Sequence, residues 1–167
     1  MVCSSISYCE ENMPILEKRL SKYEGDIQQS EMSKDQVFSM TVGKQAFDQR
    51  SEAGESLHRL IRHNQADSKE FRTLASYRGF EIKMLSLPTN QPLPETFSVK
   101  IVGENQYSVS LDLYSPLGTI QRLQHTIDHI KEDQVKTQNL LDELQDKLTT
   151  AKVEIEKNFP KENTNLN

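Results

Sequence analysis

Two parts of the chain, one near each end, repeat apolar residues at alternating steps of three and four. The longer repeat consists of Ile120, Leu123, Ile127, Ile130, Leu141, Leu144, Leu148, Ala151 and Ile155. Only Gln134 and Thr137 are polar on this stripe, and charged residues occupy the other helical faces. The spacing predicts one long helix over residues 116–159 that lies along another helix.

The shorter repeat predicts an N-terminal helix within residues 1–31. Its apolar positions are Ile6, Cys9, Met13, Leu16, Leu20, Tyr23 and Ile27. Proline is tolerated in the first turn of a helix but not in its interior. We therefore expect the firm part of this helix to begin at Pro14 and to end near Gln29, and we leave open whether residues 1–13 are helical.

The order of elements predicts that these end helices pair antiparallel, because one runs toward the middle of the chain and the other runs away from it. Ile27 is then expected near Ile120, and Met13 near residues 130–134. A partner helix that begins at Pro14 is too short to cover the far part of the stripe. The apolar residues left over are expected to bind a larger protein or a second copy in a homodimer; they are Leu141, Leu144, Leu148 and Ile155.

The region between the helices, residues 37–115, predicts the core of an α+β fold. We expect an antiparallel sheet with one packed helix, plus the two end helices as an antiparallel coiled-coil-like pair. Alternating apolar residues predict strands over residues 37–42, 45–47, 70–77, 80–87, 97–101 and 107–113. Asp48 is the expected N-cap of a helix that ends near His63. A loop over residues 88–94 and a disordered tail over residues 160–167 complete the prediction.

The start of the long helix has its own sequence signal. Ser115 and Pro116 fit the N-cap and the first helical position, although Thr119 fits the cap as well.

Charge distinguishes the classes of partner only in part. The formal charge of −5 comes from 20 basic and 25 acidic residues, and residues 32–115 hold ten of each sign. The excess acidity therefore belongs to the helices. A protein that grips nucleic acid through its phosphates needs a basic face, so direct contact with nucleic acid would require a local patch and stays an open question.

The sequence gives no sign of a membrane. No apolar run approaches the roughly 20 residues of a membrane span, and residues 1–11 lack the basic start and apolar centre of a secretion signal. We expect a cytosolic protein.

No residue cluster indicates an enzyme, a metal or a cofactor. Cys3 and Cys9 are the only cysteines, too few for a zinc site or a disulfide framework. His125 and His129 have the spacing of two metal ligands on a helix, but the sequence supplies no third ligand, so solvent-exposed histidines are the better interpretation. The chain also lacks a phosphate-binding loop and a nucleophile elbow. We therefore predict that it is not an enzyme.

One basic and aromatic group is the best candidate for binding nucleic acid or protein outside the helices. It consists of Arg72, Tyr77, Arg78, Phe80 and Lys83. Aromatic rings stack on bases and arginines pair with phosphates. The competing interpretation, a strand turn with Tyr77 and Phe80 in the core, is favoured.

Several short strings occur in an order that resembles a known family. The strings are Phe38-Ser39-Met40-Thr41-Val42-Gly43-Lys44, Glu52-Ala53-Gly54-Glu55-Ser56-Leu57, Tyr77-Arg78-Gly79-Phe80, Pro116-Leu117-Gly118-Thr119-Ile120 and Asn158-Phe159-Pro160. Over residues 15–162 the chain resembles the C-terminal region of very large helicase and DNA-methylase polypeptides of conjugative elements and phages in Gram-positive bacteria. The helicase and methyltransferase motifs are missing, so the resemblance implies neither activity. It implies a mobile genetic element and machinery that handles nucleic acid.

Two functions are compatible with that context. A free-standing module could obstruct a host defence enzyme, because small proteins of this genomic setting include inhibitors of type II CRISPR effector nucleases (anti-CRISPR proteins). Arg72, Arg78 and Lys83 would then compete at sites that hold guide-RNA or target phosphates. Alternatively, the chain is an accessory interaction module that docks on the element's own helicase or methylase. We prefer the inhibitor, and a small enzyme built on the sheet is the third possibility.

Overall fold

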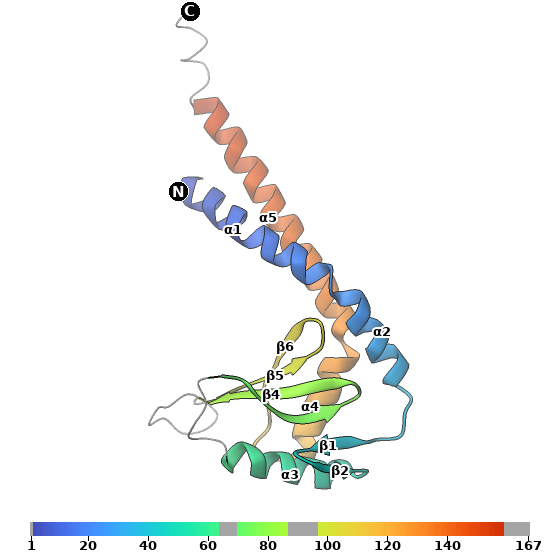
Figure 1. The fold of residues 1–167 in the computed structure, drawn as a ribbon. Helices are drawn as coiled ribbons and strands as arrows, with labels where there is room; N and C mark the ends of the chain where they lie inside the picture. Colours follow the sequence, from blue (N-terminus) through green and yellow to red (C-terminus); the bar gives the residue numbers. More distant parts are fainter. Residues whose placement is uncertain (1, 64–69, 87–96, 159–167) are drawn as a thin grey trace, which may run out of the picture. The chain divides into compact units, whose positions relative to one another are not determined.

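The computed structural model describes residues 2–63, 70–86 and 97–158 (Figure 1). The predicted loop over residues 88–94 and the predicted tail over residues 160–167 lie outside them. The chain divides into two compact units, one of residues 24–131 and the other of residues 1–23 together with residues 132–167. The division therefore falls inside both of the helices that the sequence predicts.

The first unit, which we call the sheet unit, is built on an antiparallel sheet. Its strands are β1 (Met40–Val42), β2 (Gln45–Phe47), β3 (Arg72–Tyr77), β4 (Phe80–Ser86), β5 (Phe97–Val102) and β6 (Gln106–Val109). Within the described residues the sheet has six strands in the order β2-β1-β3-β4-β5-β6. The α+β class and the antiparallel sheet are confirmed. Three strands are shorter than predicted, since β1 begins only at Met40, β3 begins at Arg72 and β6 ends at Val109.

The turn between β3 and β4 follows from its sequence. Arg78 and Gly79 both have positive φ angles, 52° and 84°, as a two-residue hairpin of the favoured twist requires. Glycine adopts such angles without steric strain. The tight connection predicted at these residues is confirmed.

Helices cover one face of this sheet. Buried residues of α3 (Arg50–His63) and α4 (Pro116–Asp128) contact the core, and α4 therefore packs there in addition to the helix predicted from the sequence. A Cβ atom at Gly54 would overlap the carbonyl oxygen of Pro116, so glycine permits the close approach of α3 and α4. The helix α2 (Tyr23–Ser33) contributes Asp26, whose carboxylate accepts hydrogen bonds in the β5–β6 turn from the backbone of Glu104 and Asn105.

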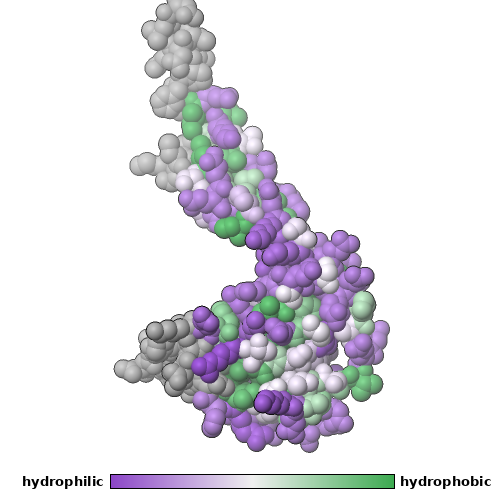
Figure 2. Space-filling view, viewed as in Figure 1, coloured by the Kyte–Doolittle hydropathy of each residue, from purple (hydrophilic) through white to green (hydrophobic). Residues whose placement is uncertain are grey.

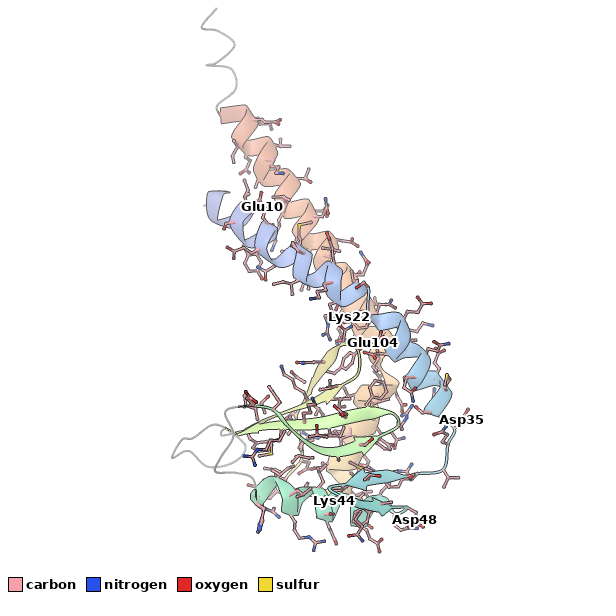
Figure 3. All side chains as sticks on the ribbon, in the orientation of Figure 1. Glu10, Lys22, Asp35, Lys44, Asp48 and Glu104 are labelled. Atoms are coloured by element: carbon pink, nitrogen blue, oxygen red, sulfur yellow. The ribbon has the colours of Figure 1, made fainter. Side chains whose placement is uncertain are left out.

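The caps of α3 and α4 differ in how well the sequence predicts them. Ser115 caps α4 by accepting a hydrogen bond from the Gly118 amide, with Pro116 following, as predicted. Thr119 lies inside that helix and is not the cap. The first helical bond of α3 joins the Ala53 amide to the Gln49 carbonyl, so Gln49 rather than Asp48 (Figure 3) occupies the cap position.

The prediction of one uninterrupted helix over residues 116–159 is wrong at His129. That residue (φ −112°, ψ 22°) separates α4 from α5 (Ile130–Asn158). The end of α4 is bound by other elements of the sheet unit. The Ser30 hydroxyl donates to the Ile127 carbonyl, and Arg78 pairs with Asp128. The Ser30 contact satisfies the Ile127 carbonyl, which would accept from the amide of Lys131 if the helix continued.

The second unit, which we call the helical unit, contains α1 (Val2–Leu20) and most of α5 (Figure 1). The prediction that the firm helix begins at Pro14 is wrong, because α1 continues through this exposed proline. Apolar residues pack on both sides of it, with Cys9 buried and Leu16 half-buried. This packing outweighs the single backbone hydrogen bond that a proline removes. The helix is interrupted instead at Ser21 and Lys22.

A polar cluster joins the two helices of this unit. The Tyr23 hydroxyl lies 2.5 Å from Asp133 Oδ2 and 2.7 Å from Thr137 Oγ1, and Arg19 also binds Asp133. The predicted antiparallel pairing is observed, but with a different register, because Arg19 rather than Met13 lies beside residue 133. The N-terminal helix therefore reaches farther along α5 than the sequence suggested.

Candidate partner-binding surfaces

The basic and aromatic group predicted from the sequence does not form one surface. Arg78 is fixed inside the sheet unit, where its guanidinium binds Asp128 Oδ1 at 2.6 Å, the Ser30 carbonyl at 2.7 Å and the Ser33 hydroxyl at 3.0 Å. Only 7% of this side chain is exposed. The residue therefore holds a helix end to a sheet turn and is poorly placed to meet a partner.

The two aromatic residues of the group lie in the core. Tyr77 and Phe80 are buried, and the Tyr77 ring lies 5.6 Å from that of Phe38. Burial raises the pKa of the Tyr77 hydroxyl above its ordinary value. The favoured interpretation of the sequence pattern, a strand turn with both rings in the core, matches this arrangement.

Lys83 and Arg72 belong to opposite faces of the sheet. Arg72 pairs in register with buried Met84, whereas Lys83 alternates with the buried residues of β4 and so projects from the other face. Among the described residues, no helix of the sheet unit lies on that second face. We call it the open face. It carries polar and partly exposed residues, among them Thr41, Thr73, Ser76, Glu81, Lys83, Lys100, Gln106 and Ser108.

Lys100, also on this open face, was not among the residues predicted from the sequence to bind a partner. It lies directly opposite Lys83 in the β4–β5 register. In the sequence, Lys100 stands out only as a polar position in a strand of alternating apolar and polar residues. Figure 2 shows near-neutral and apolar side chains over the strands, with hydrophilic ones among them. A sheet face that carries lysines, hydroxyls and amides is suited to a macromolecule, since small-molecule sites are mostly apolar.

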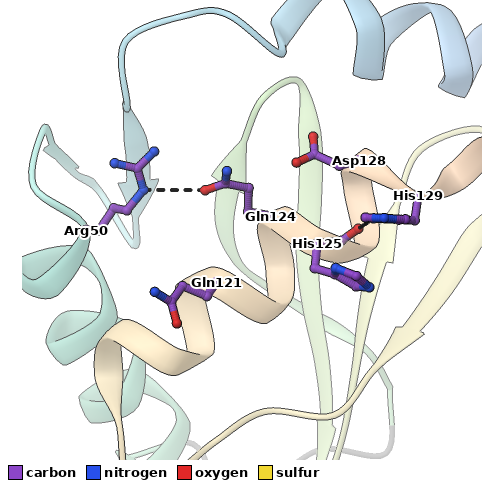
Figure 4. Close-up of a pocket in the computed structure, with 6 residues that line it drawn as sticks. All are labelled: Arg50, Gln121, Gln124, His125, Asp128 and His129. Carbon is purple, nitrogen blue, oxygen red and sulfur yellow. Dashed lines mark hydrogen bonds between the residues drawn. The ribbon is translucent and has the colours of Figure 1, made fainter.

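His125 and His129 line a shallow hollow of about 450 Å³ together with Arg50, Gln121, Gln124 and Asp128 (Figure 4). The imidazole rings stack with their centroids 3.9 Å apart, and His129 Nδ1 lies 2.7 Å from the His125 carbonyl oxygen. Zinc sites in proteins use three or four protein ligands. Among the described residues, no group of three or more His, Cys, Asp and Glu side chains is placed to hold a metal ion.

The four apolar residues of α5 that were predicted to bind a partner differ in burial. Leu144 is only 2% exposed and packs inside the helical unit, so its predicted availability to another chain is wrong. The α1 helix covers it because α1 begins at Val2 rather than at Pro14. Leu141, Leu148 and Ile155 are half-buried on the same helix. Their use in a homodimer stays a prediction. Sedimentation of the wild type against a variant with Leu148 and Ile155 replaced by glutamate tests it, whereas a change at Leu144 would disturb the packing of the helical unit.

No helix within residues 2–63, 70–86 and 97–158 is long and apolar enough to span a membrane.

Comparisons with known proteins identify no family for the chain. No family model matches the chain, and no curated protein or solved structure is similar enough to count as a match.

Proposed function

We propose that the chain is a non-enzymatic binding protein of a mobile genetic element, and that it inhibits a type II CRISPR effector nuclease in the cytosol. The observation that carries the binding role is the open face, a sheet surface whose polar residues include the cross-strand pair Lys83 and Lys100. The resemblance to polypeptides of mobile elements supplies the context.

Contacts join four of the resembling strings within the sheet unit. Gly54 of one string packs on Pro116 of another, and Phe38 of a third lies beside Tyr77 of a fourth. Residues that are distant in the sequence thus pack against one another in this unit.

A target-cleavage assay tests the inhibitor role. Several type II effectors, each loaded with guide RNA, are assayed on matched target DNA with and without the purified chain. We expect at least one effector to lose cleavage activity. Full cleavage in every case, at a large molar excess of the chain, would exclude the inhibitor and favour the accessory module of an element-encoded helicase or methylase. That alternative predicts co-purification with the larger protein and no effect on any nuclease.

Variants identify the surface that such inhibition uses. Reversal of charge at Lys83 and Lys100 should weaken inhibition, because both side chains lie on the open face. Arg78 is unsuitable for this purpose, since its loss would disturb the fold. Asp142→Asn with Glu143→Gln is the control, because both carboxylates are exposed on α5 of the helical unit. Equal loss of inhibition in both double variants would exclude the open face as the contact surface.

A further inference from the structure

One cross-strand row of residues on the open face of the sheet contains two lysines. Thr73 of β3 pairs with Lys83 of β4, Lys83 pairs with Lys100 of β5, and Lys100 pairs with Ser108 of β6. The adjacent row on the helix-covered face contains Ile82, Ile101 and Tyr107, all buried. Because neighbouring strands lie about 4.8 Å apart, the row Thr73-Lys83-Lys100-Ser108 spans about 14 Å.

The pairing of two lysines needs an explanation. Like charges directly opposite each other on neighbouring strands are destabilising. Among the described residues, the compensation is weak. Lys83 Nζ lies 3.5 Å from Glu81, whose side chain is 54% exposed, and Lys100 Nζ contacts the neutral amide oxygen of Gln106 at 3.2 Å. Exposed ion pairs of this kind contribute little stability. An anionic partner across the row would neutralise both lysines together.

The neighbours of the lysines fit a polynucleotide better than a simple anion. Thr73 and Ser108, at the two ends of the row, are exposed hydroxyl donors that can bind phosphate oxygens. Lys100 Nζ also lies 4.8 Å from the centroid of the Phe71 ring, which is half-buried beside the row. Aromatic rings next to basic groups are the platform on which proteins stack unpaired bases.

We propose that the row Thr73-Lys83-Lys100-Ser108 binds the phosphates of single-stranded nucleic acid, and that Phe71 stacks on one of its bases. The chain is acidic overall, but this row contains no carboxylate. Glu81 lies in the next row and attenuates the charge of Lys83. The inference goes beyond the inhibitor proposal and does not depend on it.

Direct binding of labelled oligonucleotides tests this inference without any nuclease. Fluorescence anisotropy is measured on the full chain with single-stranded RNA and DNA of about 16 nucleotides, the upper site size of one single-strand binding fold, and with a duplex. We expect a single strand to bind more tightly than the duplex. Preference between RNA and DNA identifies the natural ligand. Absence of binding to either single strand at low salt, or tighter binding to the duplex, would overturn the inference.

Matched variants separate the row from the total charge of the chain. Lys83→Glu with Lys100→Glu should weaken binding at least tenfold and reduce the salt slope by about 1.4, because each lost phosphate contact contributes about 0.7 for single strands. Lys147→Glu with Lys152→Glu changes the charge equally on exposed residues of α5 and should have little effect. Equal weakening in the two variants would contradict a specific row.

Substitutions at Glu81 and at Phe71 test the inference in opposite directions. Glu81→Gln should strengthen binding, because it frees Lys83 from its ion pair. Phe71→Ala should weaken binding several-fold while Phe71→Tyr retains it, since stacking needs a ring. Lys83→Gln with Lys100→Gln provides a milder pair of substitutions should the charge reversal impair folding. Unchanged affinity in this neutral variant would overturn the role of the lysines.

Discussion

The guanidinium of Arg78, in the β3–β4 turn, lies 2.6 Å from the carboxylate of Asp128 in the last turn of α4. The side chains are 7% and 21% exposed, so the pair is largely removed from water. The same guanidinium binds Ser30 and Ser33 of α2. One side chain thereby links the sheet to two helices of the sheet unit.

Arg78→Ala should lower the free energy of unfolding by about 3 kcal/mol, because removing one partner leaves Asp128 as a largely buried, unpaired charge. Arg78→Lys should have an intermediate effect, since one ammonium group cannot replace three separate donor nitrogens. Urea denaturation measures both changes. Arg59→Ala, on an exposed position of α3, is the matched control. Losses of equal size at positions 78 and 59 would show that the network contributes nothing particular to stability.

The sequence predicts well those features that depend on neighbouring residues. Alternating apolar positions predict β4 and β5, and glycine at position 79 predicts the turn before β4. Ser115 followed by Pro116 predicts the start of α4. In each case the determining signal lies within a few residues of the feature, so a single sequence contains it.

The features that sequence reasoning missed depend on distant residues. The segment around His129 contains no glycine or proline, and the helix ends there because Ser30 and Arg78 bind the end of α4. The Lys83–Lys100 pair arises only from the β4–β5 register. The burial of Leu144 required α1 to continue through Pro14, an outcome decided by packing in the helical unit rather than by local propensity.

A buried histidine predicts how stability depends on pH. His58 is 3% exposed and its Nε2 lies 2.7 Å from Thr119 Oγ1. The Thr119 hydroxyl donates its own hydrogen to the Asp112 carbonyl, so His58 Nε2 is the donor and Nδ1 the unprotonated nitrogen. Burial, assisted by Arg62, lowers the pKa of His58, and Asp112 opposes that shift. Protonation at Nδ1 would place a charge in the core.

Stability should fall as the pH drops below about 6.5, the pKa of histidine in the unfolded chain. Below that pH the unfolded state binds more protons than the folded state until the lowered pKa is reached, and this favours unfolding by at most about 1.4 kcal/mol per pH unit. His58→Gln, which keeps a donor for Thr119, should flatten the dependence between about pH 7.5 and about pH 5.5, whereas His63→Gln on an exposed position should not. Thermal unfolding at each pH measures this. Identical pH profiles for the wild type and His58→Gln would contradict the assignment.

Two leucines on α5 provide a matched test of the helical unit. Leu144 is 2% exposed and Leu140, one turn earlier, is 43% exposed. Leu144→Ala should lower stability by about 2 kcal/mol or more, because it leaves a cavity between α1 and α5. Leu140→Ala removes the same atoms and changes helix propensity equally, yet it should cost less than about 1 kcal/mol because those atoms already contact water. Amide hydrogen exchange in α1 and α5 measures the difference directly, since local opening of the pair exposes both backbones. Faster exchange in α1 only after the Leu144 substitution would establish that α1 packs on this part of α5, and equal exchange in the two variants would contradict the pairing.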